Sequence, residues 1–257
     1  MDEFRRLVEI MARLRGPGGC EWDLAQSHST LRQYLLEEAH EVLEAISRND
    51  PELLCEELGD LLLQILFHAR IAEEAGTFRI SDVIDRISEK MIRRHPHVFG
   101  EARADSPDAV SRQWDHIKRT VENRVHPSLL GGVPRTLPAL LRAEKISRKA
   151  SRAGFDWESA GQVMEKIEEE ISELREAIPG TDPETVEHEL GDLLFAIVNL
   201  ARFLRVNPEI ALDSANRRFE RRFLAMETIA RESGGSVEGT DMETLDRYWK
   251  EAKKRVG

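Results

Sequence analysis

The chain of 257 residues is longer than the roughly 100–200 residues of a typical domain, so we expect two domains or one domain that is duplicated. Its 37 lysines and arginines against 48 aspartates and glutamates leave a net charge of −11, which argues against binding nucleic acid through bulk positive charge. Charged residues make up 33% of the chain and aromatic residues 6%, a balance typical of amphipathic helices rather than a β-sandwich, and it predicts a mostly helical protein.

The N-terminal segment 1–14 predicts an amphipathic helix and not a targeting signal. It carries acidic residues at a helical apolar spacing, without the basic start and unbroken apolar run of a signal peptide. The longest apolar run, residues 61–67, is interrupted by Gln64 and is far shorter than the ~20 residues that cross a bilayer. Cys20 and Cys55 have no CxxC partner, so we expect two reduced thiols. These features predict a cytoplasmic protein that does not cross a membrane.

Residues 31–69 predict an antiparallel helical hairpin. Apolar residues recur at spacings of three and four over residues 31–46 and again over residues 58–69. Between the two stripes, Asp50 followed by Pro51 is typical of an N-cap and a first helical position, where the missing N–H of proline costs nothing. Each stripe needs a buried partner, so the two helices are expected to pack together.

The chain then repeats itself. Proline and glycine interrupt the apolar period over residues 124–134, and we place the boundary near Leu130, which gives domains 1–130 and 131–257. At a constant offset of 132 residues, the segments 36–46, 50–52 and 57–62 correspond to 168–178, 182–184 and 189–194. The chain is therefore two copies of one unit, called copy one and copy two below.

Paired carboxylates are the candidate site of each copy. Glu38 and Glu41 are three residues apart, so they share a helix face, and Glu57 and Asp60 do the same on the partner helix. The corresponding residues of copy two are Glu170, Glu173, Glu189 and Asp192. A solvated acidic face is the alternative. Recurrence of both pairs in register, although like charges three apart repel, favours a cation site.

The donor type indicates which cation. An all-oxygen set suits Mg²⁺, with Mn²⁺ as the second candidate, and Mg²⁺ usually lies between carboxylates and substrate phosphates. Gly59 and Gly191 lie inside the helices beside the acids. Because a mid-helix glycine costs about 0.5–1 kcal/mol relative to alanine, we expect another helix to approach closely there.

Basic and aromatic residues follow the acids. Arg218 and Arg222 are four apart on one predicted helix, and Trp249 and Lys253 are four apart on the last one. Arginine binds phosphate oxygens through a planar fork and tryptophan can stack on a base, so these residues and the acids could hold a nucleoside triphosphate across its metal. An exposed basic helix with a core tryptophan stays open as the alternative.

These motifs together resemble the MazG family of all-α nucleoside triphosphate pyrophosphohydrolases, in its long form with two tandem MazG domains. The family pattern EExxE followed by ExxD stands at residues 37–60 and again at 169–192, and the segments 20–23, 93–99 and 154–157 are also similar to the family. The resemblance implies that the acids bind Mg²⁺, that Arg218, Arg222 and Lys253 meet phosphates, and that Trp249 lies by the nucleoside. It also implies four-helix bundles completed across a homodimer.

One departure from the family concerns copy two. Related second domains often carry a lysine shortly before ExxD, where this chain has Thr185 and His188. The phosphate contacts that such a lysine makes are therefore in question here.

The implied reaction is metal-assisted hydrolysis of a nucleoside triphosphate to the monophosphate and diphosphate, with Glu173 or Glu41 as the general base by position. The alternatives are a narrower pyrophosphohydrolase, phosphoribosyl-ATP or dUTPase-like, and a non-catalytic module that dimerises and binds nucleotides or a protein. Neither nucleic acid nor a membrane is an expected partner. The resemblance favours copy two as the more active one. Pro96 points the same way, since it disfavours helix at His95 in copy one, whereas copy two has no proline beyond Arg222.

Overall fold

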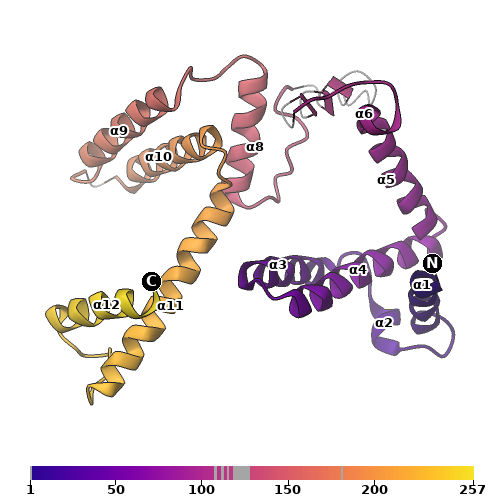
Figure 1. The fold of residues 1–257 in the computed structure, drawn as a ribbon, viewed down its shortest axis with the longest axis horizontal. Coiled ribbons are helices and arrows are strands. Elements are labelled where there is room, and N and C mark those ends of the chain that lie inside the picture. Colours follow the sequence, from indigo (N-terminus) through magenta and orange to yellow (C-terminus); the bar gives the residue numbers. More distant parts are fainter. Residues whose placement is uncertain (1, 107–108, 111–112, 115, 118–127, 181) are drawn as a thin grey trace. The chain divides into compact units, whose positions relative to one another are not determined.

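The structure is a computed structural model that describes residues 2–106, 109–110, 113–114, 116–117, 128–180 and 182–257. The fold is all-α: 74% of the described residues are helical and none of them lies in a strand, which confirms the predicted class. The chain divides into two compact units, residues 1–124 and 125–257 (Figure 1). A boundary near Leu130 stays a prediction, and the segment 118–127 beside it lies outside the described residues.

Unit 1 is built around one long helical hairpin. Its described helices are α1 (Asp2–Leu14), α2 (Glu21–Ala25), α3 (Arg32–Arg48), α4 (Pro51–Glu74), α5 (Ile80–Arg94) and α6 (Pro96–Phe99). Helices α3 and α4 pack along each other as predicted, and α1 and α5 also contact α4. The helix before Pro96 ends at Arg94, as predicted, and His97 follows in the short helix α6.

Unit 2 contains two packed helix pairs. Its helices are α8 (Ala139–Arg152), α9 (Ala160–Ala177), α10 (Pro183–Phe203), α11 (Pro208–Glu232) and α12 (Met242–Val256). Helix α9 packs on α10 and α12 packs on α11, while α8 contacts both α10 and α11. With no proline after Arg222, α11 continues for ten more residues to Glu232, as the sequence predicts.

The N-caps of the two hairpins confirm the repeat. The Asp50 carboxylate accepts hydrogen bonds from the backbone N–H groups of Glu52 and Leu53, both at 3.1 Å. The Asp182 carboxylate accepts from the N–H of Glu184 at 3.2 Å and from the Thr185 hydroxyl at 2.6 Å. Thr185, which replaces the lysine of related domains, therefore acts in capping α10.

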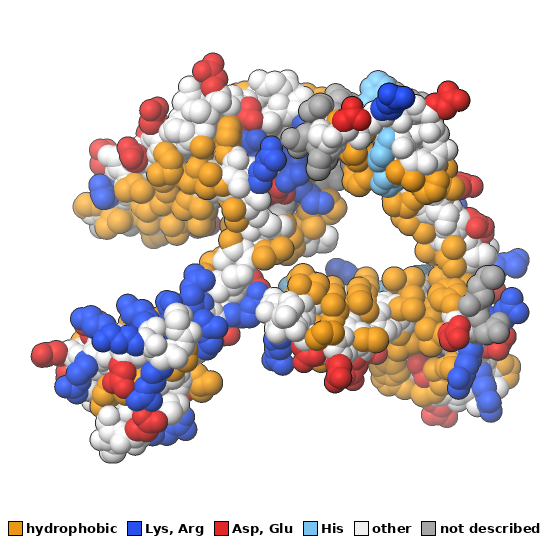
Figure 2. Space-filling view, in the orientation of Figure 1, with side chains coloured by type: hydrophobic (Ala, Val, Ile, Leu, Met, Phe, Trp, Pro, Cys, Tyr) orange, Lys and Arg blue, Asp and Glu red, His pale blue; other side chains and the backbone are white. Residues whose placement is uncertain are grey.

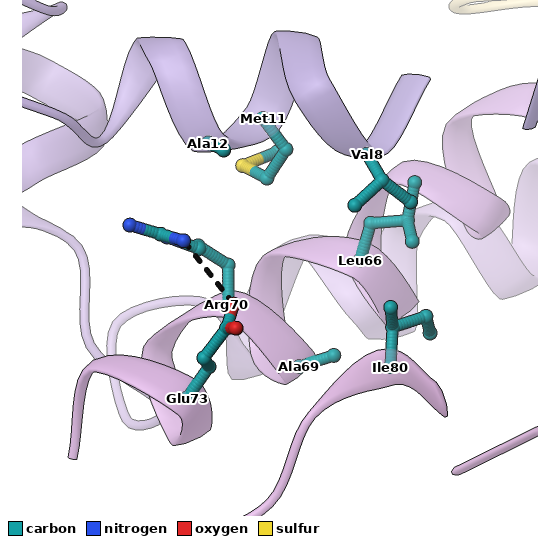
Figure 3. Close-up of a pocket in the computed structure, with 8 residues that line it drawn as sticks. All are labelled: Val8, Met11, Ala12, Leu66, Ala69, Arg70, Glu73 and Ile80. Carbon is teal, nitrogen blue, oxygen red and sulfur yellow. Dashed lines mark hydrogen bonds and ion pairs between the residues drawn. The ribbon is translucent and has the colours of Figure 1, made fainter. Parts of the chain in front are cut away.

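An apolar cluster packs α1 against α4. Met11, Leu31, Leu66 and Phe67 form the buried core of unit 1. A small pocket beside this core is lined mainly by apolar side chains from α1 and α4 and by Ile80, with the Arg70–Glu73 ion pair at its edge (Figure 3). Leu66 is nine residues, about two and a half helical turns, after Glu57, so the pocket lies on the opposite face of α4 from the acids.

Each helix pair of unit 2 has its own core. Val163, Ile167 and Ala196 fill the α9–α10 contact. A separate cluster fills the α11–α12 contact and consists of Met226, Ile229 and Ala252. A polar network ties α8 to α10, in which Arg202 donates from Nε to the Ser147 hydroxyl at 2.8 Å and forms an ion pair with Asp156.

Large apolar side chains remain exposed on both hairpins. Figure 2 shows hydrophobic side chains gathered over α3–α4 and over α9–α10, and Lys and Arg side chains gathered over α11–α12. On α10 the exposed side chains of Leu190, Leu194 and Ile197 follow the i, i+4, i+7 spacing of one helix face. Copy one repeats the first and last of them as Leu58 and Ile65. Within the described part of the chain, no helix has the length and apolar character needed to span a bilayer.

Candidate active site

Three of the four predicted carboxylates of copy one meet. Oxygens of Glu38 on α3 and of Glu57 and Asp60 on α4 all lie within 4.8 Å of one another. The fourth, Glu41, is outside this group but is close enough to Glu38 to raise the pKa of that carboxyl. The hairpin therefore brings both predicted pairs to one place, with Glu41 one turn along α3.

In copy two the four predicted carboxylates fall into two groups. Oxygens of Glu170, Glu173 and Glu189 form one group in which all lie within 4.8 Å of one another. Asp192 belongs to a second such group, with His188 and Glu189. Glu189 is thus common to both groups, and the structure does not bring Asp192 as close to the α9 acids as Asp60 is to Glu38.

The carboxylates in each copy repel one another. Partial burial, followed by the charges of Asp60 and Glu41, raises the pKa of Glu38 above its ordinary value. Partial burial and the charge of Glu41 likewise raise the pKa of Glu57. In copy two, partial burial and Glu170 raise the pKa of Glu173, although the nearby Lys166 opposes this. A cation among these oxygens would relieve the repulsion.

Lys166 is a feature that the sequence analysis missed. Its Nζ lies 2.7 Å from Glu169 Oε1 and 2.9 Å from Glu170 Oε1, and these two ion pairs raise the pKa of the lysine. Its position three and four residues before the two glutamates is the i, i+3 and i, i+4 spacing of helical ion pairs, so the signal was present in the sequence.

His188 also lies among the copy-two acids. Its Nδ1 is 3.4 Å from Asp192 Oδ2 and 3.7 Å from Glu189 Oε1. Its side chain is 73% exposed, so it borders the carboxylate cluster from the solvent side.

Gly59 and Gly191 lie beside the acids, but the expected close helix approach within the chain is wrong. A Cβ atom at either position would meet no described atom within 4 Å, and both glycines are exposed. The glycines instead leave open space on the hairpin surface next to the carboxylates, because the buried face of each helix points to its hairpin mate.

The basic and aromatic residues gather on α11–α12. Arg222 donates from Nε and Nη2 to the backbone oxygen of Gly257, at 3.1 and 2.9 Å. Trp249 is partly buried against the Met226 cluster, and its ring centroid is 5.3 Å from that of Phe219. Trp249 therefore has part of the core packing that the alternative interpretation predicts. Lys253 lies one turn after it on α12.

The acidic and basic sets lie on different helix pairs. The acids of copy two belong to α9 and α10, whereas Arg218, Arg222, Trp249 and Lys253 belong to α11 and α12. No hydrogen bond or ion pair among the described residues joins the two sets. In copy one, Trp114 packs edge-on against His95 with centroids 5.0 Å apart, so its surroundings differ from those of Trp249.

Comparison with known proteins decides the family. A sequence profile of the MazG nucleotide pyrophosphohydrolase domain matches residues 26–99 and 158–223. The chain belongs to the MazG family. The two matched segments confirm the tandem MazG domains, and each includes one hairpin with its carboxylates. Trp249 and Lys253 lie beyond the second matched segment.

Full-length relatives extend the likeness beyond the two MazG segments. The chain is 49% identical over 250 residues to the nucleoside triphosphate pyrophosphohydrolase/pyrophosphatase MazG of Thermotoga maritima, covering 97% of this chain and 95% of that protein. It is 44% identical over 261 residues to the nucleoside triphosphate pyrophosphohydrolase of Escherichia coli K12, covering 99% and 98%. It is also 46% identical over 253 residues to the uncharacterized protein YabN of Bacillus subtilis, covering 98% of this chain but 52% of that longer protein.

MazG pyrophosphohydrolases generally depend on a divalent metal. The donor atoms of this chain suit such an ion, because carboxylate oxygens from both helices of each hairpin converge within reach of one cation. The all-oxygen groups suit a hard ion, and the His188 group adds one nitrogen.

Proposed function

We propose that the chain is a nucleoside triphosphate pyrophosphohydrolase that uses Mg²⁺, or Mn²⁺ in its place, to convert a nucleoside triphosphate and water to the monophosphate and diphosphate. The observation that carries the proposal is the convergence of the MazG carboxylates in both copies. Relatives that align along nearly the whole chain bear the name of this activity.

The carboxylates are proposed to hold the metal and the attacking water. A bound divalent cation would neutralise phosphate charge and lower the pKa of water. Glu38, Glu41, Glu57 and Asp60 would hold it in copy one, and Glu170, Glu173, Glu189 and Asp192 in copy two. Glu173 and Glu41 are the candidate general bases.

The α11–α12 pair is proposed to hold the substrate. Arg218, Arg222 and Lys253 would contact phosphates, and Trp249 would lie by the nucleoside. In support, the Arg222 fork already donates two hydrogen bonds to one oxygen, and Trp249 forms an aromatic surface with Phe219.

A homodimer is proposed to complete the bundles. Each hairpin leaves an apolar stripe exposed, with side-chain exposures on α10 of 46% for Leu190, 47% for Leu194 and 44% for Ile197. A second copy of the chain could cover these stripes and form four-helix bundles. The mate could also bring an α11–α12 pair to the acids, which the described contacts of one chain do not do.

Two other functions predict different results. A narrower pyrophosphohydrolase would act on one class of nucleotide only, and a non-catalytic module would bind nucleotide without turnover. Retention of all four acids in both copies favours catalysis, because a binding module has no need of a complete set.

The deciding experiment is a panel of nucleoside triphosphates incubated with purified protein and Mg²⁺, with products separated by ion-exchange chromatography. We expect monophosphate and diphosphate from several nucleotides and no turnover in excess EDTA. Orthophosphate and nucleoside diphosphate as first products, or unchanged turnover in EDTA, would contradict the proposed reaction. Mn²⁺ added back after chelation tests the alternative metal.

A further inference from the structure

The two copies differ at the position one turn before the α3 and α9 acids. At the offset of 132 residues, Tyr34 of copy one corresponds to Lys166 of copy two. Lys166 forms ion pairs with Glu169 and Glu170, whereas the Tyr34 ring packs against Trp22 with centroids 5.8 Å apart and adjoins the Met11 cluster. At this position, copy two therefore has a lysine that pairs with its acids, whereas copy one has a neutral ring that packs against its core.

Within the part of copy one that the structure describes, no ion pair replaces the one that Lys166 makes with the acids of copy two. Among the described residues, no Lys or Arg forms an ion pair with Glu38, Glu57 or Asp60. A second position increases the difference in charge between the two copies. Glu56 of copy one corresponds to His188 of copy two, and a histidine adds no negative charge. At these two positions, copy one thus has one more acid than copy two and lacks both the lysine and the histidine.

This difference in charge acts directly on a divalent cation. Attraction between a metal and its site grows with the negative charge of the ligands, and a fixed positive charge a few ångströms away reduces it. Lys166 contacts Glu170, one of the three acids that converge in copy two, so a metal there meets the ammonium group or must displace it. The lysine side chain is 35% exposed, so solvent screens part of this effect.

We propose that, in the nucleotide-free protein, copy one is the tighter site for a divalent cation and that Lys166 sets the difference by neutralising the acids of copy two. This inference rests on the metal sites of the proposed function and adds an order of filling. Copy one fills first as the free cation concentration rises, and copy two fills at a concentration at least about tenfold higher.

The test is a titration of the full chain with Mn²⁺ alone, followed by the electron paramagnetic resonance signal of free Mn²⁺. Two background variants assign the sites: Glu57→Gln with Asp60→Asn removes the copy-one set, and Glu189→Gln with Asp192→Asn removes the copy-two set. We expect the tight class to disappear in the first background and to remain in the second.

Substitutions at Lys166 and Tyr34 then test whether the lysine causes the difference in Mn²⁺ affinity. In the background that keeps copy two, Lys166→Met should tighten Mn²⁺ binding by about ten- to hundredfold. In the background that keeps copy one, Tyr34→Lys should weaken binding to a similar degree. Lys250→Met, which removes an exposed Lys–Asp pair on α12, is the matched control and should change neither affinity.

Circular dichroism and thermal melting identify any variant that fails to fold, and Lys166→Arg, which keeps the charge, should retain weak binding at copy two. A tight class that survives loss of the copy-one set, or unchanged affinity in folded Lys166→Met, overturns the inference. Diphosphate release by the unaltered chain tests the proposed function separately. Ordered Mn²⁺ binding without diphosphate release would refute the reaction alone, and release with two equal sites would refute the inference alone.

Discussion

The guanidinium group of Arg222 donates two hydrogen bonds to the backbone oxygen of Gly257, at 3.1 and 2.9 Å. The contact fixes the α11 side chain beside the last turn of α12, the turn that carries Lys253. The same Nε and Nη2 donors could form charge-assisted hydrogen bonds with phosphate oxygens. The residue is therefore oriented before substrate binds.

Arg222→Ala tests this role. Loss of charge-assisted hydrogen bonds worth roughly 1.5–3 kcal/mol should lower kcat/KM by about ten- to hundredfold, while the melting temperature changes little. Arg231→Ala, on the exposed surface of the same helix, is the control and should leave kcat/KM unchanged. If Arg222→Ala lowers the melting temperature and has no specific effect on kcat/KM, the residue has a structural role. For the partly buried Trp249, Trp249→Phe is the milder variant to compare.

Glu38→Gln separates metal binding from stability. The raised pKa of Glu38 means that its charged form is disfavoured in the fold, so the metal-free protein loses stability as pH rises through this pKa. At neutral pH in EDTA the variant should be more stable than the unaltered chain, by about 0.2–0.5 kcal/mol for each like-charge contact removed. Added Mg²⁺ should also raise the melting temperature of the variant by less than that of the unaltered chain.

Differential scanning calorimetry in EDTA and in Mg²⁺ measures both effects of Glu38→Gln. Glu89→Gln on α5 removes an exposed carboxylate outside the carboxylate groups and serves as the control. A variant that is destabilised in EDTA, or that keeps the full Mg²⁺ gain, would contradict the prediction.

Local sequence signals predicted the helices and part of the site. Asp50-Pro51 and Asp182-Pro183 predicted two helix starts, and both caps form, because an N-cap depends only on residues within one turn. The spacing of Glu57 and Asp60 likewise placed both carboxylates on one face. The distance of Asp192 from the α9 acids was not predictable, since it depends on how α9 and α10 pack, whereas its i, i+4 contact with His188 follows the local helical spacing.

The exposed α10 stripe gives a test of the dimer. Leu194→Glu places a charge in the middle of the stripe, so we expect a dimer to become a monomer in size-exclusion chromatography with light scattering. Ile10→Glu alters an α1 side chain of nearly equal exposure, 44% against 47%, and should leave the mass unchanged. An unaltered chain that elutes as a monomer would refute the proposed homodimer, and a dimeric Leu194→Glu would place the interface elsewhere.

Glu74 should make unit 1 sensitive to acid. Hydrogen bonds from Arg15 hold the pKa of Glu74 below its usual value of 4.5, although partial burial opposes them, and Arg70 adds a second donor at 2.9 Å. The carboxylate therefore contributes stability above the unfolded pKa, and this contribution is lost as pH falls through the lower folded pKa. Glu74→Gln should cost about 1.5–3 kcal/mol at pH 7.

Urea unfolding from pH 7 to below pH 4 measures this contribution of Glu74. The stabilities of Glu74→Gln and the unaltered chain should converge at the acid end. Glu73→Gln is the control, since Glu73 forms a more exposed ion pair with Arg70, and its effect should be within about 0.5 kcal/mol. A constant difference between Glu74→Gln and the unaltered chain at every pH would contradict the assignment.

The last prediction concerns which copy catalyses the reaction, and we expect copy two to do most of it. In copy one, α5 ends at Arg94 because of Pro96, and the next aromatic candidate, Trp114, contacts His95. In copy two, α11 continues past Arg222 to Glu232 and packs against α12, which brings Phe219 to Trp249. Among the described residues, copy two alone therefore combines a continuous basic helix with an aromatic partner that this helix contacts.

Asp60→Ala and Asp192→Ala compare the two copies directly. Diphosphate release should fall by at least about a hundredfold in Asp192→Ala, because a metal ligand and the charge that it neutralises are lost together, and by much less in Asp60→Ala. Far-UV circular dichroism confirms that each variant folds. A large loss in Asp60→Ala with activity kept in Asp192→Ala would reverse the assignment. Equal losses would mean that both copies catalyse, in spite of the helix break at Pro96.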